Sequence, residues 1–325
     1  MKTALVFGAG GLIGSHMVTR LKSDGYFVRG IDIKYPEFSK TDADEFIVGD
    51  LRSAATVYRV MEPIDNRPFD LLFQFAADMG GAAFVFSGDY DAEIMQNSAL
   101  INLHTCKYAV DRKVKKILYS SSACMYPQEI QDSVDNLGLK ETDGLPANPD
   151  SEYGWEKVFS ERLYLAYNRN FRLDVRICRF HNVFGENGCY EGVRPKAPSA
   201  LCRKVALAND GDEIEVWGDG QQTRSFLYID EAIEGCIRLV ESNYIYPVNI
   251  GSDQIISIND LAKMVIEISG KNISIKNVQS NSIGVRGRNS ENTLIKEKLN
   301  WSPTQPLNIG IEKLYSWVNS KTKNK

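Results

Sequence analysis

The sequence predicts an α/β fold, a doubly wound parallel sheet with a smaller, interleaved C-terminal lobe. In the first half of the 325 residues, short β-branched and aromatic runs alternate with longer segments of helical periodicity, which is typical of repeated strand–helix–strand units. A glycine-rich segment follows the first apolar run. After about Arg179 the alternation becomes irregular, and glycine and proline become frequent, which indicates a second lobe.

The strand candidates are spaced as right-handed crossovers require. They are Thr3–Phe7, Phe27–Asp32, Glu45–Val48, Leu71–Phe75, Lys116–Ser120 and Asp174–Arg179. The later segments are expected as helix 230–241, strand 247–250, helix 258–269 and a closing helix 307–319. We therefore assign 1–178, with 226–250 returning to it, to the sheet domain, and 179–225 with 251–325 to the second lobe.

The composition, 43% hydrophobic and 25% charged, is that of a folded protein without long disordered segments. A net charge of -4 leaves no surplus of cations for a nucleic-acid backbone, so we expect no such partner. Because the sequence shows no signal-peptide core and no membrane-spanning apolar run, we expect a cytoplasmic protein that does not bind membranes. Six scattered cysteines and three histidines predict neither a metal site nor a disulfide framework.

The glycine-rich segment has the spacing G-x-x-G-x-x-G, with Gly8, Gly11 and Gly14 around Leu12 and Ile13. Small residues between a strand and a helix let the backbone and the helix N-terminus approach a pyrophosphate. The segment therefore predicts a Rossmann-type dinucleotide site. The structural alternative is a tight turn that only packs the helix on the strand.

Two acidic residues follow the next strands. Asp32 ends the second strand, where a carboxylate accepts hydrogen bonds from the adenine-ribose hydroxyls and disfavours the 2′-phosphate of NADP. We therefore expect NAD as the cofactor, although Lys34 lies close by in the chain. Asp50 follows the third strand and could reach the adenine edge, or it could simply cap a turn.

Tyr153 and Lys157 stand one helical turn apart in Tyr-Gly-Trp-Glu-Lys, on one face of a predicted helix. An ammonium there can lower the phenol pKa, so that the phenolate takes a hydroxyl proton. This spacing occurs on many helices by chance. A second observation strengthens it: Ser122 follows the strand that ends at Ser120, at the edge of the sheet where ligands bind.

Taken in order, the glycine motif, the strand-end serines and the Tyr–Lys pair resemble the short-chain dehydrogenase/reductase family, in its extended, sugar-nucleotide-modifying branch. The resemblance covers nearly the whole chain. It implies that Tyr153 is the acid–base catalyst for hydride transfer, that Lys157 holds the nicotinamide ribose of NAD, and that Ser122 orients the substrate hydroxyl. The second lobe is then expected to bind a nucleotide sugar.

Within that branch, eight longer stretches resemble the GDP-mannose 3,5-epimerase family. They are Ala77–Gly81, Ser121–Tyr126, Arg179–Asn182, Lys196–Pro198, Trp217–Gly220, Gln222–Phe226, Asn249–Asp253 and Gly284–Ser290. The resemblance implies oxidation of the sugar at C4, which acidifies the C–H bonds at C3 and C5. It also implies Cys124 as the base and Lys196 as the opposing acid, with GDP-mannose converted to GDP-L-galactose, GDP-L-gulose or both.

The same resemblance implies the substrate contacts. Gly80 and Gly81 would let the sugar approach the backbone, and Arg224 and Arg288 are the strongest candidates for the diphosphate. The full predicted set is Gly80, Gly81, Ser122, Ala123, Cys124, Asn182, Lys196, Ala197, Lys204, Gln222, Thr223, Arg224 and Arg288. Members of the family are typically homodimers, which implies an interface formed by helices at 91–113 and 152–168.

The chain departs from the family at two places. Ala82-Ala83 stand where the family has Met-Gly, and Pro195 stands where it carries Glu. Neither departure removes a chemical group that the reaction needs. Two alternatives remain: a nucleotide-sugar C4-epimerase or 4,6-dehydratase, which shares the Tyr–Lys pair but does not need Cys124 with Lys196, and an NAD-binding regulatory protein without catalysis.

Overall fold

The computed structural model describes residues 1–280 and 284–323, so five residues of the predicted 251–325 segment lie outside it. Its centre is a parallel sheet of seven strands in the order β11-β6-β5-β4-β1-β2-β3. The strands are β1 Thr3–Phe7, β2 Phe27–Asp32, β3 Glu45–Val48, β4 Leu71–Gln74, β5 Lys116–Ser122, β6 Val175–Phe180 and β11 Val248–Ile250. The fold class predicted from the sequence is confirmed.

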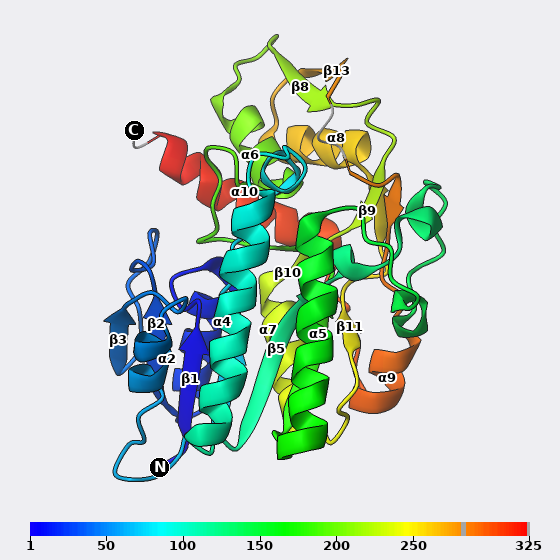
Figure 1. The fold of residues 1–325 in the computed structure, drawn as a ribbon. Coiled ribbons are helices and arrows are strands. Elements are labelled where there is room, and N and C mark those ends of the chain that lie inside the picture. The colour runs from blue at the N-terminus through cyan, green and yellow to red at the C-terminus, as the bar shows by residue number, and fades with distance from the viewer. Residues whose placement is uncertain (281–283, 324–325) are drawn as a thin grey trace.

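Helices cover both faces of this sheet (Figure 1). The long helices α4 and α5 pack against each other on one face, and α1 and α7 contact each other on the other face. The flanking helices are α1 Leu12–Ser23, α2 Ala54–Val60, α4 Asp91–Asp111, α5 Glu152–Phe171 and α7 Ile229–Glu241. Strand alternation explains the two layers, because Ala4 and Val6 of β1 belong to one apolar cluster and Leu5 and Phe7 to the other.

Outside the central sheet, the described residues form three small sheets, β10-β7, β12-β9-β14 and β13-β8. Their strands are β7 Val183–Phe184, β8 Glu213–Trp217, β9 Thr223–Ser225, β10 Leu227–Tyr228, β12 Ile255–Ser257, β13 Ser274–Val278 and β14 Gly287–Arg288. The remaining helices are α3 Ala82–Val85, α6 Ala197–Leu207, α8 Ile258–Ser269, α9 Thr293–Leu299 and α10 Leu307–Lys323. Short 3₁₀ turns span Ala123–Met125, Gln128–Gln131 and Glu141–Gly144.

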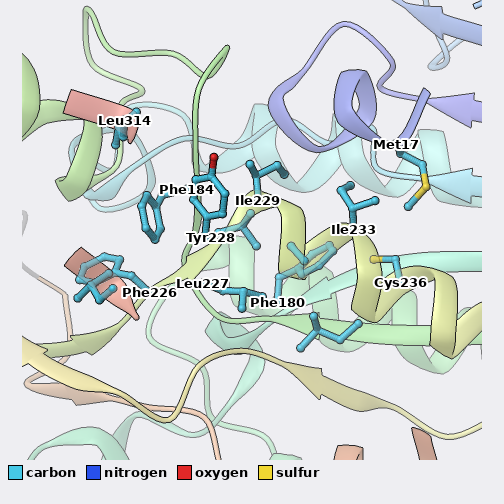
Figure 2. Packing of buried hydrophobic residues seen from close by; sticks show 14 of the residues in the cluster. Met17, Phe180, Phe184, Phe226, Leu227, Tyr228, Ile229, Ile233, Cys236 and Leu314 are labelled. Atoms are coloured by element: carbon cyan, nitrogen blue, oxygen red, sulfur yellow. The ribbon is translucent and has the colours of Figure 1, made fainter. Parts of the chain in front are cut away.

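One apolar core joins the lobe to the sheet. It runs from Met17 of α1 over Ile233 of α7 to Phe226, and it includes Phe184 and Leu314 of the second lobe (Figure 2). Burial of apolar side chains contributes roughly 25 cal/mol per Å², so a shared core resists separation of the two parts. Residues of both parts can therefore line one site with fixed geometry.

The helix α6 was not expected from the sequence, because the glycines and prolines before it indicated loops. Lys196 is its N-cap and a proline occupies its first turn, where the missing N–H costs no hydrogen bond. The strand β5 also runs two residues further than predicted, through Ser122. Among the described residues, no helix is both long and apolar enough to cross a membrane.

Candidate active site

A cavity of about 400 Å³ lies beyond the carboxyl ends of β4, β5 and β6. Phe75 follows β4, Ser122 ends β5 and Asn182 follows β6, and all three side chains line the cavity. Residues of α6, β8 and β9 complete the wall from the second lobe. This is where open doubly wound sheets bind their ligands.

All five predicted catalytic residues line this one cavity: Ser122, Cys124, Tyr153, Lys157 and Lys196. They come from three places far apart in the sequence, namely the end of β5, the start of α5 and the start of α6. Their convergence is a property of the fold that no single motif could establish. Acid, base and hydroxyl-binding groups therefore surround the same volume.

The turn after β5 places Cys124. The Ser122 hydroxyl accepts a hydrogen bond from the Cys124 backbone N–H at 3.2 Å, which closes the 3₁₀ turn. The N-terminus of α5 then packs directly on this turn, because a Cβ at Gly154 would lie only 2.2 Å from the Cys124 carbonyl oxygen. Only glycine fits there. Its neighbour Tyr153 is thereby held in the same apolar cluster as the Cys124 side chain.

Lys157 is buried between aromatic rings and a carboxylate. Its Nζ lies 5.2 Å from the centre of the Tyr153 ring and 3.2 Å from Glu156 Oε2. Burial alone would lower the pKa of Lys157, but the Glu156 carboxylate outweighs it and the pKa is raised. The lysine therefore stays a cation beside Tyr153.

Tyr153 differs from the expectation in one respect. Burial raises the pKa of Tyr153, and the Lys157 charge and a hydrogen bond with Ser122 only partly oppose that rise. Lys157 thus acts in the predicted direction, but desolvation is the larger effect in the protein without ligands. The phenol is accordingly protonated at neutral pH in this state.

Lys196 is the N-cap of α6, and it interacts electrostatically with Cys124. Burial lowers the pKa of Lys196, and the Cys124 charge partly opposes this. A lysine with a lowered pKa gives up its proton more readily than an exposed one. The arrangement therefore suits a proton donor that lines the same cavity as Cys124.

Two buried guanidinium groups lie on paired strands, since Arg288 of β14 is in register with Arg224 of β9. Burial, and then the Arg288 charge, lower the pKa of Arg224 to about 9. This shift expresses the cost of holding two cations together in a poorly solvated place. An anion with two charged groups, such as a diphosphate, would offset that cost.

Arg288 is held by three side chains at once. Its Nε donates to Gln131 Oε1 at 2.6 Å, its Nη1 to Cys124 Sγ at 3.0 Å and its Nη2 to Asp150 Oδ2 at 3.0 Å. Burial works to lower the pKa of Arg288, but Cys124 and Asp150 outweigh it and raise that pKa. The arginine thus connects the anion site to the sulfur atom.

The cavity wall also contains the predicted residues Lys204, which lies on α6, and Gln222, which directly precedes β9. Lys204 Nζ donates to the Glu215 carbonyl at 2.6 Å, and Gln222 Nε2 donates to the Trp217 carbonyl at 2.9 Å. Gln222 Oε1 is buried and has no hydrogen-bond partner among the described residues. A ligand donor in the cavity could provide one.

Most of the other predicted substrate residues also line the cavity, namely Gly80, Gly81, Ala123, Asn182 and Ala197. Thr223 differs from them, because it is absent from the lining and its hydroxyl donates to the Val134 carbonyl at 2.7 Å. This position holds β9 to the segment after Gln131.

The glycine motif forms a cradle that suits a dinucleotide. Gly8 has a φ of +79°, and a Cβ at Gly14 would lie 2.0 Å from the Gly8 carbonyl oxygen, so the third glycine permits close helix–strand packing. Gly11 is the N-cap of α1 and provides no side-chain cap, which leaves the first-turn amides for an anion. Asp32 accepts from the Gly10 amide at 2.9 Å, which fixes the carboxylate beside the cradle.

The remaining predicted cofactor residues are Leu12, Ile13 and Asp50. Leu12 and Ile13 begin α1, and Ile13 also lines the cavity. Asp50 pairs with the neighbouring Arg52 at 2.7 Å, and this contact lowers the pKa of Asp50. The interaction that the structure gives Asp50 is therefore the turn-like one; contact with adenine stays a prediction.

Sequence reasoning missed several residues that support the site. Glu156, which holds Lys157, belongs to a buried network in which Asn102 Nδ2 donates to Glu156 Oε1 and to Ser160 Oγ, each at 3.0 Å. The only available signal was a glutamate on the inner face of a helix, four residues before a serine. Trp217 and Glu215 of β8 also line the cavity. The alternating pattern of this segment is typical of a strand, but it does not indicate that the strand reaches the site.

Comparison with known proteins shows the family of this chain. The model of the NAD dependent epimerase/dehydratase family matches residues 4–251. GDP-mannose 3,5-epimerase from Arabidopsis thaliana is 42% identical over 318 residues, which cover 97% of this chain and 82% of that protein. GDP-mannose 3,5-epimerase 1 from Oryza sativa subsp. japonica is 42% identical, covering 97% of this chain and 81% of the relative.

More distant proteins share the fold. The dTDP-4-dehydro-6-deoxy-D-allose reductase of Streptomyces bikiniensis is 28% identical over 99% of this chain and 98% of its own. The solved UDP-glucose 4-epimerase of Thermotoga maritima superposes with a TM-score of 0.86 at 23% identity, over 98% of this chain and 99% of that one. At that identity the likeness shows the fold alone.

The arginine pair generates a prediction about anion affinity. Replacing Arg224 by Gln should weaken binding of a nucleoside diphosphate about 10- to 100-fold, because a charge-assisted hydrogen bond contributes about 1.5–3 kcal/mol. Isothermal titration calorimetry measures the affinity. Arg286→Gln is the matched control, since Arg286 pairs outside the lining with Asp219 at 3.0 Å and should change affinity less than about 2-fold. Equal losses in both variants would contradict the assignment.

Proposed function

The chain belongs to the NAD dependent epimerase/dehydratase family, and we propose that it epimerises a GDP-sugar, GDP-mannose, at C3 and C5. NAD is the cofactor. The products are GDP-L-galactose, GDP-L-gulose or both. The observation that carries the proposal is the shared cavity of Tyr153, Cys124 and Lys196, with the Arg224–Arg288 pair in its wall.

The first step needs an acid–base group and a hydride acceptor at C4. Gly8–Gly14 and Asp32 would hold NAD, which would accept the hydride from C4 and return it. Tyr153 must be deprotonated to take the C4 hydroxyl proton as the ketone forms, and the Lys157 cation favours that phenolate. Ser122 hydrogen-bonds with Tyr153 and orients the same hydroxyl.

The second step inverts a carbon beside the ketone. The Cys124 thiolate removes the C5 proton, and the electron pair moves into an enolate on the C4 oxygen. Lys196 then delivers a proton to the opposite face of C5, which restores the ketone with inverted configuration. Once Cys124 has released its proton to solvent and Lys196 has taken one up, the same pair can act at C3 before the hydride returns. Arg288 Nη1, 3.0 Å from the sulfur, places a cation beside the thiolate.

The wall of the second lobe suits the nucleotide part. Arg224 and Arg288 are the diphosphate ligands, and their buried charges favour a doubly anionic group. Asn182, Lys204 and Gln222 supply further polar groups to the same wall. The guanine assignment itself is supported by the relatives that act on a GDP-sugar.

Isotope incorporation tests the reaction class. In deuterated water with GDP-mannose, solvent deuterium should enter C5, with or without C3, as NMR will show. Cys124→Ala should slow this incorporation about 10²- to 10⁴-fold, the usual contribution of a general base. Cys189→Ala, which changes an exposed cysteine, should leave it intact.

The alternative reactions give different outcomes in the same experiment. A C4-epimerase would leave C3 and C5 of GDP-mannose unlabelled. A 4,6-dehydratase would yield a 4-keto-6-deoxy sugar. An NAD-binding protein without catalysis would leave GDP-mannose unchanged, and any of these results would overturn the proposed reaction.

The proposed enzyme acts as a homodimer through α4 and α5. Leu103 of α4 and Trp155 and Phe159 of α5 are exposed apolar side chains, and these two helices pack side by side. Exposed apolar groups gathered on neighbouring helices favour burial against an identical surface. The cytoplasmic location expected from the sequence stays a prediction.

A charge in this surface should separate the subunits. Phe159→Glu places a carboxylate in the proposed interface, so light scattering coupled to size-exclusion chromatography should show a shift from dimer to monomer. Phe171→Glu is the matched control, because Phe171 is also exposed but lies at the far end of α5. A dimer that persists in Phe159→Glu would contradict this interface.

A further inference from the structure

We propose that Arg194 is a positioning residue for Lys196. Together with Asp78, Met79 and Gly81 it forms what we call the Arg194 clamp, which joins two cavity-lining segments. This inference rests on the proposed function, because it concerns the proton that Lys196 delivers. The clamp fixes the segment before α6, so that the ammonium faces the sugar carbon from the side opposite Cys124.

The clamp is a set of contacts between residues 78–84 and residues 194–195. Arg194 Nη1 donates to the Met79 carbonyl at 2.8 Å, and Nη2 donates to Asp78 Oδ1 at 3.1 Å. The guanidinium also lies 4.0 Å from the centre of the Phe84 ring. In return, the Gly81 N–H donates to the Arg194 carbonyl at 2.9 Å. The side chain and the backbone of Arg194 therefore both bind the segment 78–84.

Asp78 is itself anchored to the sheet domain. Its backbone N–H donates to Ser98 Oγ at 3.1 Å, and its second carboxylate oxygen accepts from Asn97 Nδ2 at 2.9 Å. Both partners belong to α4, which packs on the helix of Tyr153. The clamp thus transmits the position of α4 and α5 to the segment that precedes Lys196.

Little freedom remains between the clamp and Lys196. A Cβ at Gly81 would lie 2.2 Å from the Pro195 carbonyl oxygen, so the two segments touch at backbone level. Pro195 has a fixed φ, and Lys196 follows directly as the N-cap of α6. The proline that replaces the family's glutamate therefore restricts the backbone between Arg194 and Lys196. The contacts of Arg194 fix the position of this backbone relative to residues 78–84.

The energetics separate this role from folding. Arg194 is about half exposed, and exposed ion pairs contribute about 0–1 kcal/mol to stability. Misplacement of a catalytic group by about 1 Å can cost about 10²-fold in rate. Loss of the clamp should therefore change proton delivery while the free energy of unfolding changes little.

The experiment compares inversion with exchange. In deuterated water Cys124 can remove the C5 proton and return a deuteron to the same face, which labels GDP-mannose without inverting it. Delivery from Lys196 gives the inverted product. Arg194→Ala should lower the ratio of inverted product to labelled GDP-mannose about 10-fold or more, with KM changed less than about 3-fold.

Four further variants sharpen the result. Arg194→Lys keeps the charge facing Asp78 and should recover part of the ratio. Asp78→Ala should lower it, and the double variant with Arg194→Ala should lose less than the sum of the single losses in free energy, because the pair acts as a unit. Arg238→Ala removes a similar partly exposed ion pair, with Glu234 at 2.6 Å, and should change nothing.

The outcomes distinguish the two levels of the account. A wild-type ratio in Arg194→Ala, or equal loss of inversion and exchange, would overturn the clamp and leave the proposed function standing. Wild-type enzyme that neither labels nor inverts GDP-mannose would overturn the proposed function, and the clamp with it. Selective loss of inversion, partly restored by lysine, supports the clamp.

Discussion

The contact on which the site depends is the backbone approach of α5 to the turn after β5. A side chain at Gly154 would lie 2.2 Å from the Cys124 carbonyl oxygen, so glycine is required for the helix to start where it does. This approach brings Tyr153 beside Cys124 and leaves Ser122 between strand and helix. A sugar bound in one pose can then undergo both the redox reaction at C4 and proton removal at the carbon beside C4.

Charge organises the same cavity. Arg288 hydrogen-bonds to Cys124 and Asp150 while its strand neighbour Arg224 is buried with a pKa near 9, so the wall is strongly cationic before ligand binds. Lys157 is kept charged by the buried carboxylate of Glu156, whereas burial makes Lys196 a readier proton donor. Neighbouring lysines in one cavity thus have opposite pKa shifts, because only one has a carboxylate partner.

Much of this arrangement could be predicted from local patterns. The strands β1, β2 and β3 have the predicted bounds, since apolar alternation and flanking turn residues determine them locally. The helix α6 was missed because Pro198 and the residues around it have the composition of a loop, and only the N-cap geometry distinguishes the two. Tertiary context explains this difference.

Some residues of the site could likewise be predicted from the sequence, and others could not. Tyr153, Lys157 and Cys124 were predictable from motifs and a family resemblance, and the fold places them at one cavity. Glu156 and Asp78 were not, because their importance arises from partners distant in the sequence, Asn102 and Arg194. Desolvation also has no sequence signal, so the raised pKa of Tyr153 could not be anticipated.

The central claim is that oxidation occurs at C4 while proton exchange occurs beside it, within one cavity. The most direct measurement uses GDP-mannose carrying deuterium at C4, incubated with the enzyme in ordinary water and analysed by NMR. The account predicts that the inverted products keep deuterium at C4, because the transferred hydride returns to the same carbon, while C5 takes its proton from solvent. Loss of the C4 deuterium to water during inversion would contradict it.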